Sequence, residues 1–205
     1  MSINVNEALN KLAKNEKTLK DFAGIMELAL SEDRGIILND VDCDSGDAVE
    51  IWVRFWNKVD SRDNIPVEER KPIKIYINSY GGSSVSMYQI SDIIKLSKTP
   101  VWTIATGAAY SSGFFVFING HKRIAYPNAS FLFHEGSVGQ IGDAGKFRNF
   151  AEFYSEELNR LKIMVLESTK ISEELYEKKK KDDWWFFPEE AIKLGVCDEI
   201  ATEIV

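Results

Sequence analysis

The sequence predicts an α/β fold in which short buried strands alternate with helices around a parallel sheet. Apolar runs of strand length, at 73–78 and 101–106, alternate with segments of helical periodicity such as 84–97. Glycine-rich turns follow both of these strands, at 81–82 and at 107–113. Because this alternation is typical of βαβ units, we expect a parallel sheet that helices cover on both faces.

The other elements are read from the same periodicities, with helices marked by apolar spacings of three and four residues. A charged stretch that contains prolines is expected to be a loop, because it supports neither pattern. The expected elements are a helix over 5–30, a strand over 35–38, a helix that opens at Gly46, a loop over 60–72, a helix that starts at Ser111 or Ser112, strands over 123–126 and 130–134, and a long helix over 143–169.

Length and hydropathy predict one domain over 1–205, with a helical segment at 1–28, because 205 residues suffice for a single core. No apolar run approaches the length of a membrane span. Residues 1–20 are polar and charged and lack the apolar region of a signal peptide. We therefore expect a cytoplasmic protein with no membrane segment.

Charge and residue usage narrow the possible partners. A net charge of −7 and a pI ≈ 5.0 disfavour binding to nucleic-acid phosphates. Two cysteines, Cys43 and Cys197, have neither the count of a disulfide framework nor the spacing of a zinc site. With only two histidines, His121 and His134, multi-histidine metal sites are excluded. We expect no metal, no nucleic acid and no cofactor.

The two glycine-rich turns are the places where an α/β sheet would build a ligand site. Neither turn matches GxGxxG or GxxxxGK[ST], so nucleotide binding is not predicted. Each turn leads into a helix and can offer free backbone N–H groups. Two such groups that point at one spot would form an oxyanion hole.

Ser111 lies in the second turn, where a hydroxyl would be exposed at the carboxyl edge of the sheet. Alone, it is equally a helix N-cap, and Ser112 competes for either role. His134 ends an apolar strand, where a titratable group needs partners. It is therefore a better candidate base than His121, which stands in a polar turn.

A carboxylate that orients the imidazole would complete such a site. Asp182 and Asp183 precede the aromatic segment 184–187, which could shield one of them and strengthen its interaction with an imidazole. The alternative is a charge at a helix end.

The helix expected over 143–169 has an unusually wide apolar stripe, which includes Phe147, Phe153 and Val165. Such a stripe can be ordinary core, but at this length we expect burial against another subunit.

Four collinear segments of the chain carry one resemblance. They are 76–82, 107–113, 126–130 running on to His134, and Asp183 followed by 188–198. With them, the chain resembles the proteolytic subunit of the Clp protease, a serine peptidase of the crotonase-like fold, over residues 29–200.

The resemblance implies a crotonase/ClpP-like α/β fold, a repeated ββα superhelix with a long protruding handle helix at 143–169. It implies that Ser111 is the nucleophile and that His134 is the general base and acid. Asp183 would orient His134, and the backbone N–H groups of Gly82 and Ser112 would form the oxyanion hole.

The function that the resemblance implies is a serine endopeptidase, a hydrolase that cleaves unfolded polypeptides inside a closed chamber. The chamber would be a homo-oligomer of two stacked heptameric rings. A separate hexameric AAA+ ATPase would deliver the substrates, so ATP would be used only by that partner.

Several residues depart from the family pattern. Tyr80 and Gly136 replace prolines, Ser112 replaces a methionine, and Glu135 replaces a glutamine. Tyr80 and Gly136 should make their segments more mobile. If Glu135 points toward His134, its charge should raise the imidazole pKa.

Other functions are compatible with parts of this pattern. An acyl-CoA hydratase or isomerase of the same superfold would use carboxylates, and a membrane-type peptidase would use a Ser–Lys dyad. A third possibility is a non-catalytic ring subunit, a phage assembly scaffold or a prohead-type protease. The collinear Ser111, His134 and Asp183 favour the serine endopeptidase.

Overall fold

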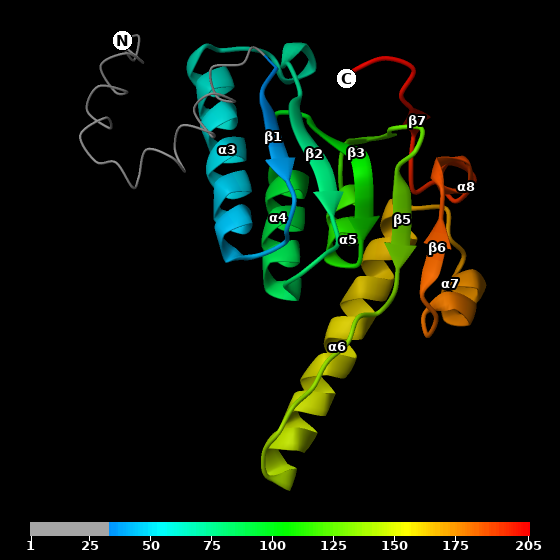
Figure 1. Cartoon of the computed structure of the whole chain (residues 1–205). Coiled ribbons are helices and arrows are strands. Elements are labelled where there is room, and N and C mark those ends of the chain that lie inside the picture. Colours follow the sequence, from blue (N-terminus) through cyan, green and yellow to red (C-terminus); the bar gives the residue numbers. More distant parts are fainter. Residues whose placement is uncertain (1–32) are drawn as a thin grey trace, which may run out of the picture.

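The computed structural model describes residues 33–205, which form a seven-stranded sheet with helices packed against it (Figure 1). The helix expected over 5–30 and the segment 1–28 lie outside these residues. In space the strands run β1-β2-β3-β4-β7, all parallel, while β5 pairs with β3 and the antiparallel β6 pairs with β5. The strands are β1 (Gly35–Leu38), β2 (Ile73–Ser79), β3 (Val101–Tyr110), β4 (Lys122–Ala125), β5 (Ser130–Phe133), β6 (Trp184–Phe186) and β7 (Glu199–Ile200).

The helices confirm the predicted α/β alternation. They are α3 (Cys43–Arg62), α4 (Ser84–Leu96), α5 (Ser112–Ile118), α6 (Ala144–Ser168), α7 (Glu173–Lys179) and α8 (Pro188–Lys193), with a short 3-10 turn, η1 (Val67–Glu69).

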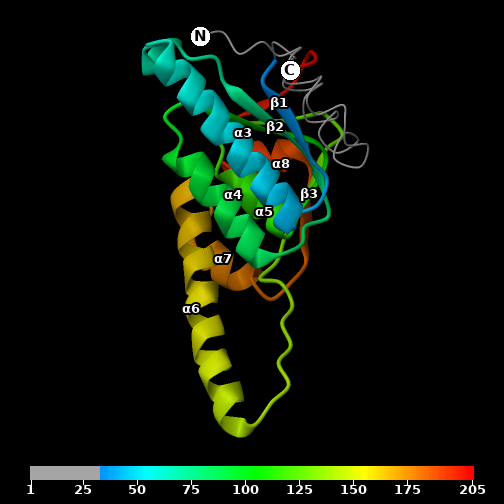
Figure 2. The same cartoon turned by 90° about the vertical axis from the view of Figure 1, so that its left-hand side faces the viewer.

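The handle helix predicted over 143–169 is α6, with Asp143 as its N-cap and Thr169 as its C-cap. The Asp143 carboxylate accepts from the backbone N–H groups of Gly145 and Lys146, which have no acceptor within the helix. The second half of α6 buries Leu161, Met164 and Val165, while the first half projects away from the sheet (Figures 1 and 2).

Helix α3 begins earlier than the predicted start at Gly46. Asp42 and Ser45 form a reciprocal capping box, in which each side chain accepts from the other residue's backbone N–H. This cap satisfies two N–H groups that would otherwise lack acceptors, so the helix starts at Cys43.

The second strand of the prediction is too short. Residues 107–110 were expected to be a turn, but they continue β3 because Ala108, Ala109 and Tyr110 pair with β5. Glycine at position 107 lets the strand pass close to Asn78, since a Cβ at this position would lie only 2.4 Å from Asn78 Oδ1. The extension of β3 moves the carboxyl end of the strand to Tyr110, directly before Ser111.

The helices do not cover both faces of the sheet within residues 33–205. Helices α3, α4 and α5 lie on the same side, as Figure 2 shows, and their apolar residues share the main core with β1, β2 and β3. On the opposite face, Ile104 and Ile124 form a smaller cluster with Trp102, Ala201 and Val205. The C-terminal segment therefore takes the place that the prediction assigned to helices.

The charged stretch 60–72 is only partly a loop, because α3 continues to Arg62 and Asp60 is fully buried. Arg34 binds the Asp60 carboxylate through both of its terminal nitrogens, at 2.7 and 2.9 Å, and Thr99 Oγ1 donates to it at 2.8 Å. Burial alone would raise the pKa of Asp60, but the hydrogen bonds from Arg34 and Thr99 outweigh it and the pKa is lowered.

Replacing Asp60 should destabilise the protein strongly, since Asp60→Ala leaves the Arg34 guanidinium buried and without its carboxylate. We expect Asp60→Ala to lower the free energy of unfolding by about 3–5 kcal/mol, measured by urea denaturation. Asp63→Ala is the matched control, because Asp63 pairs with Arg62 at the surface, and it should change the free energy by less than about 0.5 kcal/mol. Equal effects of the two variants would contradict this role of the buried pair.

The same pair makes the stability depend on pH. Because the pKa of Asp60 is lowered in the folded state, its contribution is complete above the unfolded pKa and is lost as the pH falls through the folded pKa. In Asp60→Ala, this part of the acid destabilisation should be absent.

Candidate active site

Strand pairing brings Ser111, His134 and Asp183 together. Ser111 directly follows β3, and its N–H donates to Leu132 O of β5 at 2.9 Å. His134 directly follows β5, and Phe133 pairs with Trp184 in the antiparallel β6. Continuing that register places His134 opposite Asp183.

Ser111 has a strained backbone, with φ 52 and ψ −124. A non-glycine residue in this region costs about 1–3 kcal/mol, and such residues cluster at functional sites. A Cβ on Gly81 would lie 2.8 Å from Ser111 Cβ, so only glycine allows the turn after β2 to approach so closely. The serine thus stands on a sharp strand-to-helix turn, which exposes a nucleophile in several hydrolases.

The two adjacent serines have different surroundings. The Ser112 hydroxyl is buried and donates to Gly82 O at 2.9 Å. Ser111 is the N-cap residue of α5, but its side chain makes no capping hydrogen bond. The N-cap alternative for Ser111 is therefore not supported, and its hydroxyl has no hydrogen-bond partner within residues 33–205.

His134 has one nitrogen beside Asp183 and one nitrogen without a partner. Its Nδ1 lies 3.5 Å from Asp183 Oδ1, an ion-pair separation that lacks hydrogen-bond geometry. Its Nε2 is buried and has no hydrogen-bond partner in the described part of the chain, residues 33–205, Ser111 included. A buried polar atom with no partner is costly, so it suggests a ligand or a reacting group.

The expected shielding of Asp183 by aromatic residues is wrong. The Asp183 side chain is 63% exposed. Trp184 points into the core and Trp185 is exposed, because successive residues of β6 face opposite sides of the sheet. Water therefore reaches the Asp183 carboxylate and weakens its interaction with the imidazole.

The turn after β2 holds Gly82 beside the serines. The Val41 N–H donates to Gly81 O, and the Val41 carbonyl accepts from the Ser83 N–H. Gly82 lies between these two residues, and its carbonyl accepts from the Ser112 hydroxyl. A Cβ on Gly82 would lie 2.2 Å from Val41 O, which excludes other residues here. The Gly82 N–H has no acceptor within residues 33–205. Ser112 is the first residue of α5, so its N–H has no acceptor within the helix.

Glu135 does not lie against His134. Its carboxylate accepts from Tyr176 Oη at 3.1 Å, and its carbonyl accepts from Tyr154 Oη at 3.3 Å. An effect of Glu135 on the His134 pKa was expected only if the carboxylate pointed toward His134. The carboxylate is bound by Tyr176 instead, so that expectation is not supported. Local sequence does not reveal these two bonds, because Tyr154 and Tyr176 lie on helices that follow Glu135 by 19 and 41 residues.

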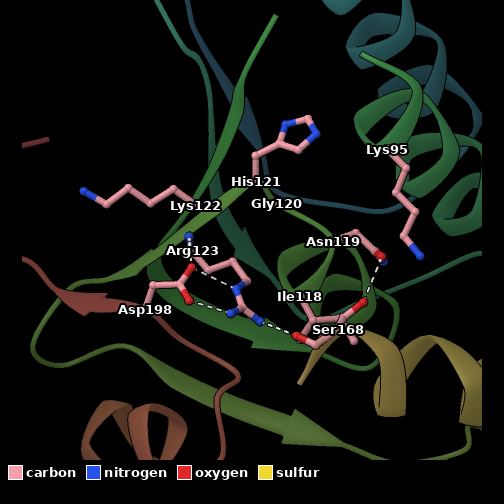
Figure 3. A pocket seen from close by; sticks show the side chains of 9 residues that line it. All are labelled: Lys95, Ile118, Asn119, Gly120, His121, Lys122, Arg123, Ser168 and Asp198. Atoms are coloured by element: carbon pink, nitrogen blue, oxygen red, sulfur yellow. Dashed lines mark hydrogen bonds and ion pairs between the residues drawn. The ribbon is translucent and has the colours of Figure 1, made fainter. Parts of the chain in front are cut away.

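A separate pocket with a volume of ≈ 420 Å³ lies at the other end of the sheet and includes Lys95, His121 and Arg123 (Figure 3). It sits at the start of β3, about 30 Å along the strand from Ser111. Arg123 pairs with Asp198 and donates to carbonyls, including that of Ser168 at the end of α6. These bonds satisfy a carbonyl at the end of α6, so Arg123 has a structural role.

His121 also has a structural role in this region. Its Nδ1 accepts from the Val101 N–H at 2.9 Å, which closes the turn before β4. Desolvation lowers the pKa of His121, which favours the neutral imidazole that this bond requires. His134, in contrast, follows β5, whose Leu132 carbonyl accepts from the Ser111 N–H.

Residues 33–205 include no group of three or more His, Cys, Asp or Glu that could hold a metal ion. Among these residues, no helix is long and apolar enough to span a membrane.

A family model described as Clp protease matches residues 65–204. The chain belongs to the Clp protease family. The match supports the peptidase class over the hydratase alternative. It also includes Gly82, Ser111, Ser112, His134 and Asp183, whereas β1 and α3 precede it.

The Clp protease match extends over the whole of α6, so the projecting helix belongs to the family region. Tyr80, which departs from the family pattern, is 80% exposed, and its ring packs at a tilt against Tyr110, with ring centroids 5.5 Å apart. Tyr110 in turn contacts Trp185 at 4.9 Å. The lost proline is thus replaced by aromatic packing beside the glycine turn.

The strain at Ser111 predicts a difference between two variants that both lack the hydroxyl. Ser111→Gly should be more stable than Ser111→Ala by about 1 kcal/mol, because glycine adopts this positive φ without steric cost. Urea denaturation of the two variants measures this difference. If Ser111→Ala were the more stable, the backbone at this position would not be strained.

Proposed function

We propose that this Clp protease family member is a serine endopeptidase with Ser111 as its nucleophile. The observation that carries the proposal is the buried Nε2 of His134, which has no hydrogen-bond partner within residues 33–205 and follows the strand whose Leu132 carbonyl accepts from the Ser111 N–H. The Ser111 hydroxyl also has no partner among these residues. A Ser–His pair needs these two atoms free for each other and for substrate. The strained turn at Ser111 and the engaged hydroxyl of Ser112 support the choice of serine.

In the proposed reaction, His134 Nε2 takes the proton of Ser111 Oγ as this oxygen attacks the peptide carbonyl carbon. His134 then gives the proton to the leaving amine, which leaves an acyl-enzyme on Ser111. Water then attacks the acyl carbon and loses a proton to His134, which returns that proton to Ser111 Oγ as the bond to the acid breaks. Asp183 stabilises the imidazolium and holds Nδ1 as its proton-bearing nitrogen.

The proposed oxyanion hole consists of the N–H groups of Gly82 and Ser112. Support comes from the lack of an acceptor for either N–H group among residues 33–205 and from the bond that Ser112 Oγ donates to Gly82 O. Donors that are fixed before reaction stabilise developing charge without reorganisation, and the loss of one such donor costs about 10²–10³ in rate. No cofactor is needed for this chemistry.

We also propose that the chain works as a homo-oligomer of stacked rings. Phe147 and Phe153 in the projecting half of α6 are 53% and 66% exposed in the single chain. A second copy that covers them would enclose a chamber around the active sites, as in the assembly that the family resemblance implies. An AAA+ ATPase partner in the cytoplasm would supply unfolded polypeptides.

Loss of the Ser111 hydroxyl should nearly abolish peptidase activity. Ser111→Ala should reduce the hydrolysis of an unstructured polypeptide by about 10³-fold or more, since only binding and the oxyanion hole remain. Ser112→Ala keeps the proposed nucleophile and should lose about tenfold or less. If Ser112→Ala were the inactive variant, the nucleophile would be Ser112. Wild type that cleaves no better than Ser111→Ala would favour a non-catalytic ring subunit.

The assembly predicts a large particle in solution. Light scattering should give a mass of many 23.3 kDa subunits, and the pair Phe147→Glu and Phe153→Glu should lower that mass by placing charges in the apolar contact. Lys178→Glu on α7 is a control that changes charge at an exposed site outside α6. A monomer of wild type at micromolar concentration would contradict the proposed assembly.

A further inference from the structure

His134 stands where the chain leaves the sheet. Strand pairing holds the residues before it, since Phe133 pairs with Trp184. After Glu135 the support ends, because residues 136–143 are exposed. Gly136 has φ 84, and a Cβ built on it would meet nothing within 4 Å. Glu135 is therefore the last residue that could anchor His134 from its C-terminal side.

Two tyrosines from different helices bind Glu135. Tyr176 of α7 donates to its carboxylate at 3.1 Å, and Tyr154 of α6 donates to its carbonyl at 3.3 Å. Lys162 binds Glu173 and Glu177 at 2.7 and 2.8 Å and thereby fastens α7 to α6. Glu135 is thus held by side chains of both α6 and α7, and the Lys162 ion pairs hold these two helices together.

Tyr176 contacts both neighbours of His134. Its ring packs against Phe133, with centroids 5.4 Å apart, and its hydroxyl binds Glu135. The side chain is 1% exposed, so its hydroxyl needs an internal partner and the Glu135 carboxylate supplies it. Burial, followed by the nearby Glu135 charge, raises the pKa of Tyr176, so the hydroxyl keeps the proton that it donates.

We infer that Tyr176 is a positioning residue for His134, which it holds in register by packing on Phe133 and by binding Glu135. This inference rests on the proposed function, in which His134 is the base. His134 needs this support because the next segment begins at Gly136, which stands where the family pattern has a proline. A proline would restrict the backbone after the histidine, and the Tyr176–Glu135 bond restricts it here instead.

The site geometry shows why the position of His134 would limit the rate. Nδ1 is already 3.5 Å from Asp183, and Nε2 must reach the Ser111 hydroxyl. A misplacement of about 1 Å can cost on the order of 10²-fold in rate. A variant that loosens His134 should therefore slow the chemical step while substrate binding is unchanged.

The test measures the rate at which a fluorophosphonate probe labels the full-length assembled protein. Tyr176→Phe removes one hydroxyl and keeps the ring on Phe133, while Glu135→Ala removes the acceptor. Each should lower the limiting rate of labelling about tenfold, with the probe concentration at half-saturation unchanged. Because both variants break the same bond, the double variant should be no slower than the slower single variant. Glu135→Gln keeps an acceptor oxygen and should lose less than about threefold.

The matched control is Tyr88→Phe. Tyr88 Oη also donates across two helices, from α4 to α6 at 3.3 Å, but its acceptor is Glu157 O rather than Glu135. Its removal should leave the labelling rate unchanged. Denaturation midpoints would show whether each variant folds. If Tyr176→Phe does not fold, the labelling rate of Glu135→Ala tests the positioning role.

The outcomes separate the two proposals. Equal labelling of Tyr176→Phe, Glu135→Ala and Tyr88→Phe would overturn the positioning role and leave the serine peptidase intact. A wild type that labels no faster than Ser111→Ala would overturn the peptidase and the positioning role together.

Discussion

The position of β5 between β3 and β6 is the constraint on which the site depends. Its parallel pairing with β3 brings Leu132, two residues before His134, to the Ser111 N–H, and its antiparallel pairing with β6 sets His134 opposite Asp183. Backbone hydrogen bonds fix both registers, and a slip of one residue would turn His134 to the other face of the sheet. The side chains that the chemistry needs are thus placed by main-chain pairing between segments far apart in the sequence.

The order of strands and helices could be predicted because local periodicity reports which side of an element is buried. The limits of β3 could not, since residues 108–110 are a strand only through their pairing with β5, which follows later in the chain. Local sequence likewise placed Asp60 in a charged loop, although Arg34 and Thr99 bury it. In both places a distant partner determines the structure, and a local pattern does not contain that partner.

The candidate site residues could be chosen from the sequence because glycine turns, a serine, a histidine and an aspartate occur in one order that resembles a family. Their surroundings could not be predicted. The exposure of Asp183 depends on which face of β6 is covered, and the partner of Glu135 is Tyr176 from a separate helix. Local sequence left Ser111 and Ser112 as alternatives, and the resemblance chose Ser111. The hydrogen bond from Ser112 to Gly82 and the strained backbone of Ser111 support that choice.

The most direct measurement of the central claim is the site of covalent modification by a fluorophosphonate, mapped by tandem mass spectrometry of the digested protein. A serine becomes reactive toward this probe only when a neighbouring base and an oxyanion hole activate it. The account predicts one adduct per chain, on Ser111. An adduct on Ser112 or on any other residue, or a protein that remains unmodified under conditions that label a known serine peptidase, would contradict it.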